Sequence, residues 1–275
     1  MRLASAPVTW GVWERTIDRD DLIPARDLLR TVVELGYTGI ELGPPGYLSP
    51  SLLAEFGLEL VGGFAPLRFA DADGFAEDVS LWLDPVIAAL LATGARGPVV
   101  LADGERTSFD DAAFGRVQDA VDRCRARGVP VVFHHHAATS IETPEELAAL
   151  LERTDVGICF DTGHALVGGG DPVEVARLCA GRIEHLHLKD VDPAVLERVR
   201  SGELDLDQAW ASGLFCPFGE GAVDFGAVMR ELVDYDGWVV LEQDRVAVRV
   251  EDLPAVRAVE ASNLDLVRSR NGHPD

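Results

Sequence analysis

Short apolar runs alternate with longer amphipathic segments from one end of the chain to the other. The apolar runs are rich in Val, Ile and Leu and stop at polar or glycine positions, which is typical of buried strands. We therefore predict eight strands, at residues 2–10, 38–43, 58–64, 97–102, 129–135, 156–161, 182–188 and 238–242.

The segments between these runs carry apolar residues at helical spacing. Several begin with Asp, Ser or Thr and close at glycine, as helix ends prefer. Thr143, Pro144 and Glu146 have the spacing of a capping box at the start of one of them. The predicted helices include residues 20–36, 109–128, 143–154, 171–181 and 224–235.

The alternation of strands and helices predicts a parallel sheet, and eight such units in 275 residues fit a closed (β/α)8 TIM barrel. A doubly wound open sheet is the competing arrangement, but the segment TWGVWERT lacks the glycine-rich phosphate turn expected there. No linker divides the chain, so we predict a single domain over residues 1–275. The stretch at about 201–222 is expected to be an extended loop.

The composition narrows the classes of partner. A net charge of −23 and a pI near 4.5 oppose binding to nucleic acid or to anionic membranes, although they are also common in very soluble proteins. No apolar run reaches the roughly 20 residues that span a bilayer, and the N-terminus lacks the apolar core of a secretion signal. The four cysteines form no CxxC pair, so we expect reduced thiols in a cytoplasmic protein.

Ionisable side chains gather at the ends of the predicted strands. If Leu186 and Leu188 face the helices, then His185, His187 and Lys189 point into the barrel.

The same alternation turns Asp161 inward, and Glu41 and Glu242 end two further apolar runs. Barrel enzymes keep their active sites at the C-terminal ends of the strands, which is where these groups are expected to meet.

A single carboxylate at a strand end is often only a helix cap, and a single inward histidine is more often part of the core. Asp161, His187 and Glu242 together are harder to explain in this way, because unpaired acids in a dry barrel mouth are costly. A divalent cation would neutralise them. An oxygen-rich set with one imidazole suits Mn²⁺ best, with Mg²⁺, Fe²⁺, Co²⁺ or Zn²⁺ also compatible.

Such a site fits one kind of chemistry. A metal that chelates a carbonyl and a neighbouring hydroxyl acidifies the α proton and stabilises an enediolate, and a flanking Glu can remove that proton. Reprotonation gives an isomerase or an epimerase, whereas expulsion of a β-hydroxyl gives a dehydratase. The site therefore specifies the intermediate and leaves its fate open.

Three consecutive histidines end the run VVFHHH. By alternation His134 and His136 point inward with Val132, and His135 continues the helix-facing set. We expect His136, nearest the mouth, to touch the substrate and His134 to be a hydrogen-bonded core residue one layer deeper. None of the three is expected to bind the metal.

Several segments together resemble a known family: HHHAATSIETPEEL, GICFDTGHALVGGGDP, IEHLHLKDV, PFGEGAVDF and GYTGIELGPPGYL. They are similar to the xylose isomerase-like sugar isomerase/epimerase barrels, and among these most similar to inosose (2-keto-myo-inositol) dehydratases. The resemblance covers nearly the whole chain, and its motifs are more specific for the superfamily than for the substrate.

The resemblance implies roles for individual residues. It places a metal on Glu142, Asp161, His187 and Glu242, with Glu142 and Glu242 also acting as acid and base. The last three coincide with the set reached from strand alternation, whereas Glu142 follows from the resemblance alone. It also implies a substrate contact for the His of DTGH, His164. Weaker candidates for the same pocket are Lys189 and Glu41.

One departure concerns the first strand. Inosose dehydratases carry an Asn- and Asp-bearing motif there, whereas this chain reads APVTWGVWE, so Trp10, Trp13 and Glu14 are expected to reshape the pocket mouth. We add Trp13 to the expected substrate contacts.

We therefore predict a divalent-metal lyase or isomerase acting on a keto-polyol or keto-sugar, most similar to inosose dehydratases. The first alternative is a ketose epimerase or an aldose–ketose isomerase. A remote alternative is an endonuclease for abasic DNA, which the charge of −23 opposes. A non-catalytic barrel would be expected to have lost some of these site residues. A homodimer is compatible with such barrels.

Overall fold

The computed structural model describes residues 2–104 and 106–271. Its main sheet has nine hydrogen-bonded strands in the order β3-β2-β1-β11-β8-β7-β6-β5-β4, and every pairing in that sheet is parallel. The strands are β1 (Arg2–Ser5), β2 (Gly39–Ile40), β3 (Glu59–Leu60), β4 (Gly63–Leu67), β5 (Val99–Asp103), β6 (Val131–His134), β7 (Gly157–Asp161), β8 (Ile183–Leu188) and β11 (Trp238–Leu241).

The two edge strands of this sheet, β3 and β4, follow one another in the chain with only Val61 and Gly62 between them. Both fall at the third predicted strand, so the sheet is nearly closed and has eight chain passes. This confirms the predicted TIM barrel.

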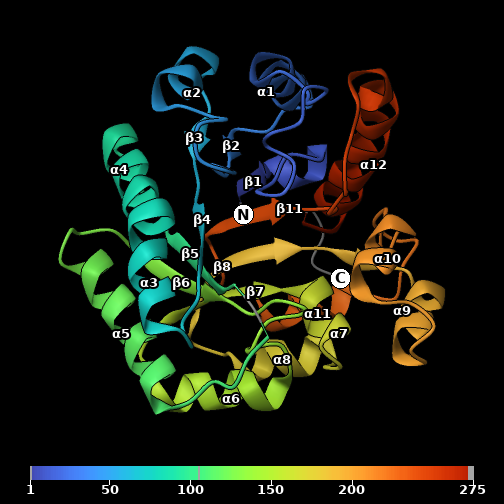
Figure 1. The fold of residues 1–275 in the computed structure, drawn as a ribbon. Coiled ribbons are helices and arrows are strands. Elements are labelled where there is room, and N and C mark those ends of the chain that lie inside the picture. Colours follow the sequence, from blue (N-terminus) through green and yellow to red (C-terminus); the bar gives the residue numbers. More distant parts are fainter. Residues whose placement is uncertain (1, 105, 272–275) are drawn as a thin grey trace.

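Helices cover the outside of the barrel (Figure 1). They are α1 (Ala25–Glu34), α2 (Pro50–Phe56), α3 (Ala72–Asp78), α4 (Asp84–Thr93), α5 (Asp111–Arg125), α6 (Pro144–Arg153), α7 (Thr162–Val167), α8 (Pro172–Leu178), α9 (Pro193–Arg200), α10 (Leu206–Ala211), α11 (Phe225–Glu231) and α12 (Leu253–Asn271). A π-helical turn, η2 (Val79–Leu83), joins α3 to α4, and a 3₁₀ turn, η3 (Val250–Asp252), precedes α12.

The predicted first strand was too long. Only Arg2–Ser5 pair with neighbouring strands, and a 3₁₀ helix, η1 (Pro7–Trp10), follows directly. Pro7 has no N–H to give to a sheet, and Gly11 closes the turn at a positive φ of 73°. The chain therefore bends at this point, and Trp13 and Glu14 lie in a loop at the barrel mouth.

The prediction of an extended loop at about 201–222 was also wrong. After β8 the chain forms β9 (Asp190–Val191), α9, α10 and β10 (Phe215–Cys216), and β10 pairs antiparallel with β9. A small apolar cluster that includes Leu196 and Phe215 holds this excursion together. Helix α10 begins at a capping box between Asp205 and Gln208, a short signal inside a polar stretch.

The expected alternation decides which strand side chains face the helices and which point into the barrel. Leu186 and Leu188 are buried in the main core between the strands and the helices, and so are Ile158 and Phe160. The other set points into the barrel, where Cys159 packs with Val100 and Val132. Within the described residues, no helix is both long enough and apolar enough to cross a bilayer.

Candidate active site

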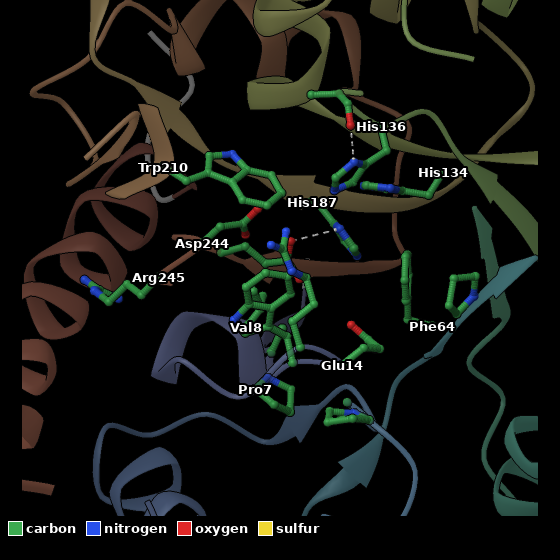
Figure 2. A pocket seen from close by; sticks show the side chains of 18 of the residues that line it. Pro7, Val8, Glu14, Phe64, His134, His136, His187, Trp210, Asp244 and Arg245 are labelled. Atoms are coloured by element: carbon green, nitrogen blue, oxygen red, sulfur yellow. Dashed lines mark hydrogen bonds and ion pairs between the residues drawn. The ribbon is translucent and has the colours of Figure 1, made fainter. Parts of the chain in front are cut away.

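A cavity of about 380 Å³ opens at the C-terminal ends of the strands. Its walls come from the loop after β1, the ends of β2, β4, β5, β6 and β8, the segment after β11, and helix α10. Figure 2 shows the side chains around it, among them His134, His136, His187, Trp210 and Asp244. The position is the one that the strand-end pattern predicted for an active site.

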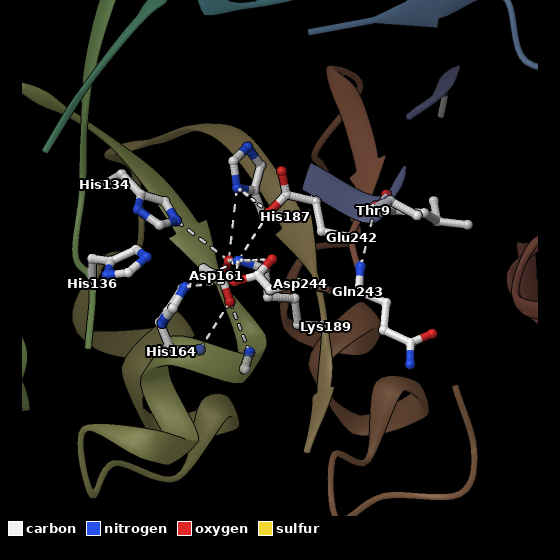
Figure 3. A network of polar contacts seen from close by, with 12 residues as sticks. Thr9, His134, His136, Asp161, His164, His187, Lys189, Glu242, Gln243 and Asp244 are labelled. Carbon is white, nitrogen blue, oxygen red and sulfur yellow. Dashed lines mark hydrogen bonds and ion pairs between the residues drawn. The ribbon is translucent and has the colours of Figure 1, made fainter. Parts of the chain in front are cut away.

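Asp161, His187 and Glu242 meet at the base of this site, from β7, β8 and the residue after β11 (Figure 3). His187 Nδ1 lies 3.2 Å from Glu242 Oε2 and 3.7 Å from Asp161 Oδ2. All three side chains are buried, and His187 and Glu242 line the cavity directly. The three residues that strand alternation predicted are therefore neighbours that could hold a metal ion.

The two carboxylate oxygens of Asp161 have different partners. Its Oδ1 accepts hydrogen bonds from the backbone N–H groups of Gly163 and His164, and so caps α7. Its Oδ2 faces the cluster, 3.2 Å from Lys189 Nζ and 3.3 Å from His134 Nε2. Although burial alone would raise the pKa of Asp161, the charges of Lys189 and its other neighbours hold that pKa well below its usual value. The carboxylate is therefore ionised.

Glu41 fixes the orientation of His187. Glu41 Oε1 lies 3.1 Å from His187 Nε2 and 2.8 Å from His185 Nε2, so this one oxygen faces both imidazoles. Burial would raise the pKa of Glu41, but His187 and His185 lower it below its usual value. With Nε2 engaged by Glu41, the other ring nitrogen of His187 faces Asp161 and Glu242.

Lys189 is a buried ammonium surrounded by acids. Its Nζ lies 2.9 Å from Glu242 Oε2, 3.0 Å from Asp244 Oδ1 and 3.2 Å from Asp161 Oδ2. Burial opposes its charge, but these carboxylates raise the pKa of Lys189 well above its usual value. Its Nζ also lies 3.0 Å from His164 Nε2. Lys189 lines the cavity, so its positive charge faces any bound molecule.

The rings of His136 and His164 pack closely against each other next to Lys189. Their ring centroids are 3.8 Å apart, and His136 Nδ1 donates to the Ala137 carbonyl at 2.7 Å. His164 Nδ1 accepts the Ala137 N–H at 3.3 Å. Burial lowers the pKa of His136 to about 3, so its imidazole is neutral. His136 lines the cavity, whereas His164 lies just outside its lining and contacts residues that do line it.

His134 is more than a core residue. It is the last residue of β6, it is 2% exposed, and it lines the cavity. Burial lowers the pKa of His134 to about 4, and its Nδ1 has no hydrogen-bond partner among the described residues.

The mouth of the cavity is aromatic. Trp13 and Trp210 meet edge to face with ring centroids 5.9 Å apart, and Trp13 Nε1 donates to the Val246 carbonyl at 3.1 Å. Trp210 Nε1 is buried without a hydrogen-bond partner in the described part of the chain. Glu14 lines the same wall, and burial raises the pKa of its carboxyl. Of the residues expected to reshape the pocket mouth, Trp13 and Glu14 therefore do line the cavity, whereas Trp10 is buried in the main core and does not.

Glu142 lies elsewhere. Its Oε2 is 2.9 Å from Arg106 Nη1, and the same guanidinium binds Glu146 and the Thr139 carbonyl. Within the described residues, Glu142 is neither in the cavity lining nor in a cluster of possible metal ligands.

Sequence reasoning missed two acids and one aromatic residue of the site. Asp244 continues the inward alternation of Glu242, and Asp103 ends β5 one residue after the predicted strand, so both had a usable signal. Trp210 had none, because its place depends on how the excursion after β8 folds back over the barrel.

Comparison with known proteins agrees with this architecture. Residues 29–262 match the family model described as a xylose isomerase-like TIM barrel. An inosose dehydratase of Geobacillus kaustophilus (strain HTA426) is 32% identical over 89% of this chain and 87% of its own. The rhizopine catabolism protein MocC of Rhizobium meliloti is 33% identical over 89% of this chain and 82% of its own.

Solved structures with lower identity share the fold. The probable 3-DHS dehydratase AsbF of Bacillus anthracis superposes with a TM-score of 0.71 at 17% identity, covering 96% of this chain and 99% of that one. A D-tagatose 3-epimerase-like protein gives a TM-score of 0.68 at 18% identity, covering 99% of this chain and 100% of that one. On the family match and the two close relatives, the chain belongs to the xylose isomerase-like TIM barrel family.

Proposed function

We propose that this protein is a sugar-modifying enzyme that acts on a keto-polyol or keto-sugar, and that it is a divalent-metal-dependent dehydratase of the inosose dehydratase type. The relatives named inosose dehydratase support the substrate class. The observation that carries the proposal is the buried group of Asp161, His187 and Glu242 at the base of the cavity.

The donor set suits a divalent cation. His187 Nδ1 is buried without a hydrogen-bond partner among the described residues, and it faces two carboxylate oxygens. Three carboxylates, those of Asp161, Glu242 and Asp244, surround Lys189, and the buried Glu41 faces His187 and His185, so acidic side chains outnumber the one lysine. Asp161, His187 and Glu242 would hold the ion, and Glu41 would orient the imidazole as outer carboxylates commonly do. We propose Mn²⁺, with Mg²⁺, Co²⁺, Fe²⁺ and Zn²⁺ as alternatives.

A cation bound there supplies Lewis acidity, which lowers the pKa of a proton next to a chelated carbonyl. The Glu242 carboxylate, at the cavity wall, would accept that α proton. The Lys189 ammonium would donate a hydrogen bond to a substrate oxygen on which negative charge develops. In a dehydration, the β C–O bond then breaks as a C=C bond forms, and the leaving hydroxyl would take the proton that Glu242 accepted, which gives water and restores the carboxylate.

The remaining predicted contacts complete a sugar site. We propose that His136, Lys189 and Glu41 contact or orient polar groups of the substrate, with His164 holding His136 and Lys189 in place. Trp13 and Trp210 would pack against its apolar C–H face, and the unpartnered Trp210 Nε1 would donate to a hydroxyl. The free and buried cysteines are consistent with the proposed cytoplasmic location, and a homodimer stays a prediction.

An epimerase or an aldose–ketose isomerase remains the alternative, because the same acid, base and metal ligands serve it. The experiment is a panel of keto-inositols, ketohexoses and 3-keto-glycosides, incubated with the Mn²⁺-loaded protein and followed by mass spectrometry and NMR. We expect one keto-inositol to lose water. Conversion at constant mass would favour the alternative.

The proposed base is tested in the same assay. We expect Glu242→Gln to lower kcat by about 10²–10⁴-fold, the range for loss of a positioned acid or base. Full activity of Glu242→Gln, or of Asp161→Asn, would show that this cluster is not the reaction centre.

A further inference from the structure

We infer that Glu14 determines substrate specificity, because its carboxylate accepts hydrogen bonds from neighbouring hydroxyl groups of the substrate at the mouth of the cavity. The inference rests on the proposed function, since it concerns the same keto-polyol or keto-sugar, and it adds that this end of the substrate is uncharged. Glu14 lies in the segment where the chain departs from the inosose dehydratase motif, so the family resemblance gives it no role.

A tight turn holds Glu14 at the cavity. The Trp13 N–H donates to the Thr16 hydroxyl at 3.0 Å, and the Thr16 N–H donates to the Trp13 carbonyl at 2.9 Å. The Thr16 hydroxyl donates to the Gly11 carbonyl at 2.9 Å, and Thr16 is buried. Glu14 follows Trp13 inside this turn and lines the cavity (Figure 2). The turn therefore fixes the backbone from which the carboxylate reaches the wall.

Among the acids that line the cavity, Glu14 differs in having no partner. The other five lining carboxylates each face a donor: Glu41 faces His185 and His187, Asp103 accepts the Ser140 N–H, Asp207 pairs with Arg15, and Glu242 and Asp244 face Lys189. The Glu14 carboxylate has no hydrogen bond or ion pair to any other described residue.

The cations along the cavity are engaged elsewhere. Arg15 follows Glu14 in the chain, but its Nη1 lies 2.9 Å from Oδ1 of Asp207, on α10. Arg245 donates through its two terminal nitrogens to neighbouring oxygens, at 2.7 Å and 2.5 Å. Lys189 is surrounded by three carboxylates. A bound molecule must therefore supply the donors that the Glu14 carboxylate lacks.

Neighbouring hydroxyl groups suit this carboxylate. Burial raises the pKa of Glu14, and only its own backbone N–H counteracts the rise. The two carboxylate oxygens can accept two O–H donors, and hydrogen bonds to a charged group are stronger than those between neutral groups. A phosphate or carboxylate on the substrate would instead be repelled, because the cations that line the cavity are already paired.

The test uses the full-length, Mn²⁺-loaded protein and the keto-polyol or keto-sugar of the panel that it converts fastest. We expect Glu14→Gln to raise KM about 10-fold and to leave kcat within threefold, because a hydrogen bond remote from the reacting atoms is equally strong before and in the transition state. Asp18→Asn is the matched control, since Asp18 is an exposed acid of the same loop outside the cavity lining. We expect its KM to stay within twofold of the native value.

Substrate analogues that each lack one hydroxyl separate a direct contact from a distorted mouth. For the analogue without the hydroxyl that Glu14 accepts, we expect the native protein to show the higher KM already and Glu14→Gln to raise it no further. A phosphate ester at the same hydroxyl should have a kcat/KM at least 100-fold below that of the parent compound.

Three results would overturn the role of Glu14 and leave the proposed function intact. They are an unchanged KM in Glu14→Gln, a rise in KM that persists with every analogue, and conversion of the phosphate ester as efficient as that of the parent compound. If the native protein converts no member of the panel, the proposed function fails and this role of Glu14 fails with it. The phosphate-ester comparison needs no variant, so it decides even if Glu14→Gln folds poorly.

Discussion

Several side chains of this site each contact two different groups. Glu41 faces His187 and His185 through one oxygen, and Asp161 uses one oxygen for α7 and the other for the cluster. Such bifunctional residues set both the position and the charge of the groups that face the cavity. Their removal should therefore change the cluster even where they would not touch a metal.

Glu41→Gln tests whether Glu41 acts on a metal through His187. The amide keeps the shape but loses the negative charge opposite His187 Nε2, 3.1 Å away. We expect Mn²⁺ affinity to fall by about 10–100-fold, as it does when an outer carboxylate behind a metal-bound histidine is changed. Titration with Mn²⁺ measures this. An unchanged affinity would mean that Glu41 acts on the substrate rather than through His187.

Strand alternation explains which site residues could be predicted from the sequence. His187 and Asp161 lie on strands whose apolar positions face the helices, and Lys189 directly follows β8, so their inward direction followed from the two-residue period. Trp210 sits on a short helix of the excursion after β8, whose packing has no such period. Likewise, the apolar run at the N-terminus hid the break that Pro7 makes.

The start of α6 fixes the backbone of Glu142. The Thr143 hydroxyl accepts the Glu146 N–H at 3.3 Å, and the Glu146 carboxylate accepts the N–H groups of Glu142 and Thr143. We expect Thr143→Ala to lower the free energy of unfolding by about 1 kcal/mol, measured in urea. Because the Glu142 carboxylate pairs with Arg106 and lies outside the group of Asp161, His187 and Glu242, we expect Mn²⁺ affinity to stay unchanged. A parallel loss of affinity would tie this helix start to the metal.

Helix α12, near the C-terminal end of the described residues, packs against the first half of the barrel. Its Glu260 is fully buried and accepts a hydrogen bond from the Tyr37 hydroxyl at 2.5 Å, while Asn263 Nδ2 donates to its other oxygen at 3.2 Å. Burial raises the pKa of Glu260 above its ordinary value of 4.5, although Tyr37, Arg245 and Asn263 each lower it in part. This carboxyl therefore ionises less readily in the folded chain than in the unfolded one.

The direction of the pH effect follows from that difference. The contribution of Glu260 to folding is fully present below pH 4.5 and is lost as the pH rises through the raised pKa of the folded state. Glu260→Gln cannot ionise and lacks this loss. We expect the unfolding free energy of Glu260→Gln, relative to that of the native protein, to increase with pH above 4.5, by at most about 1.4 kcal/mol per pH unit. Urea unfolding at several pH values measures it, and a difference that stays constant with pH would show that Glu260 ionises alike in both states.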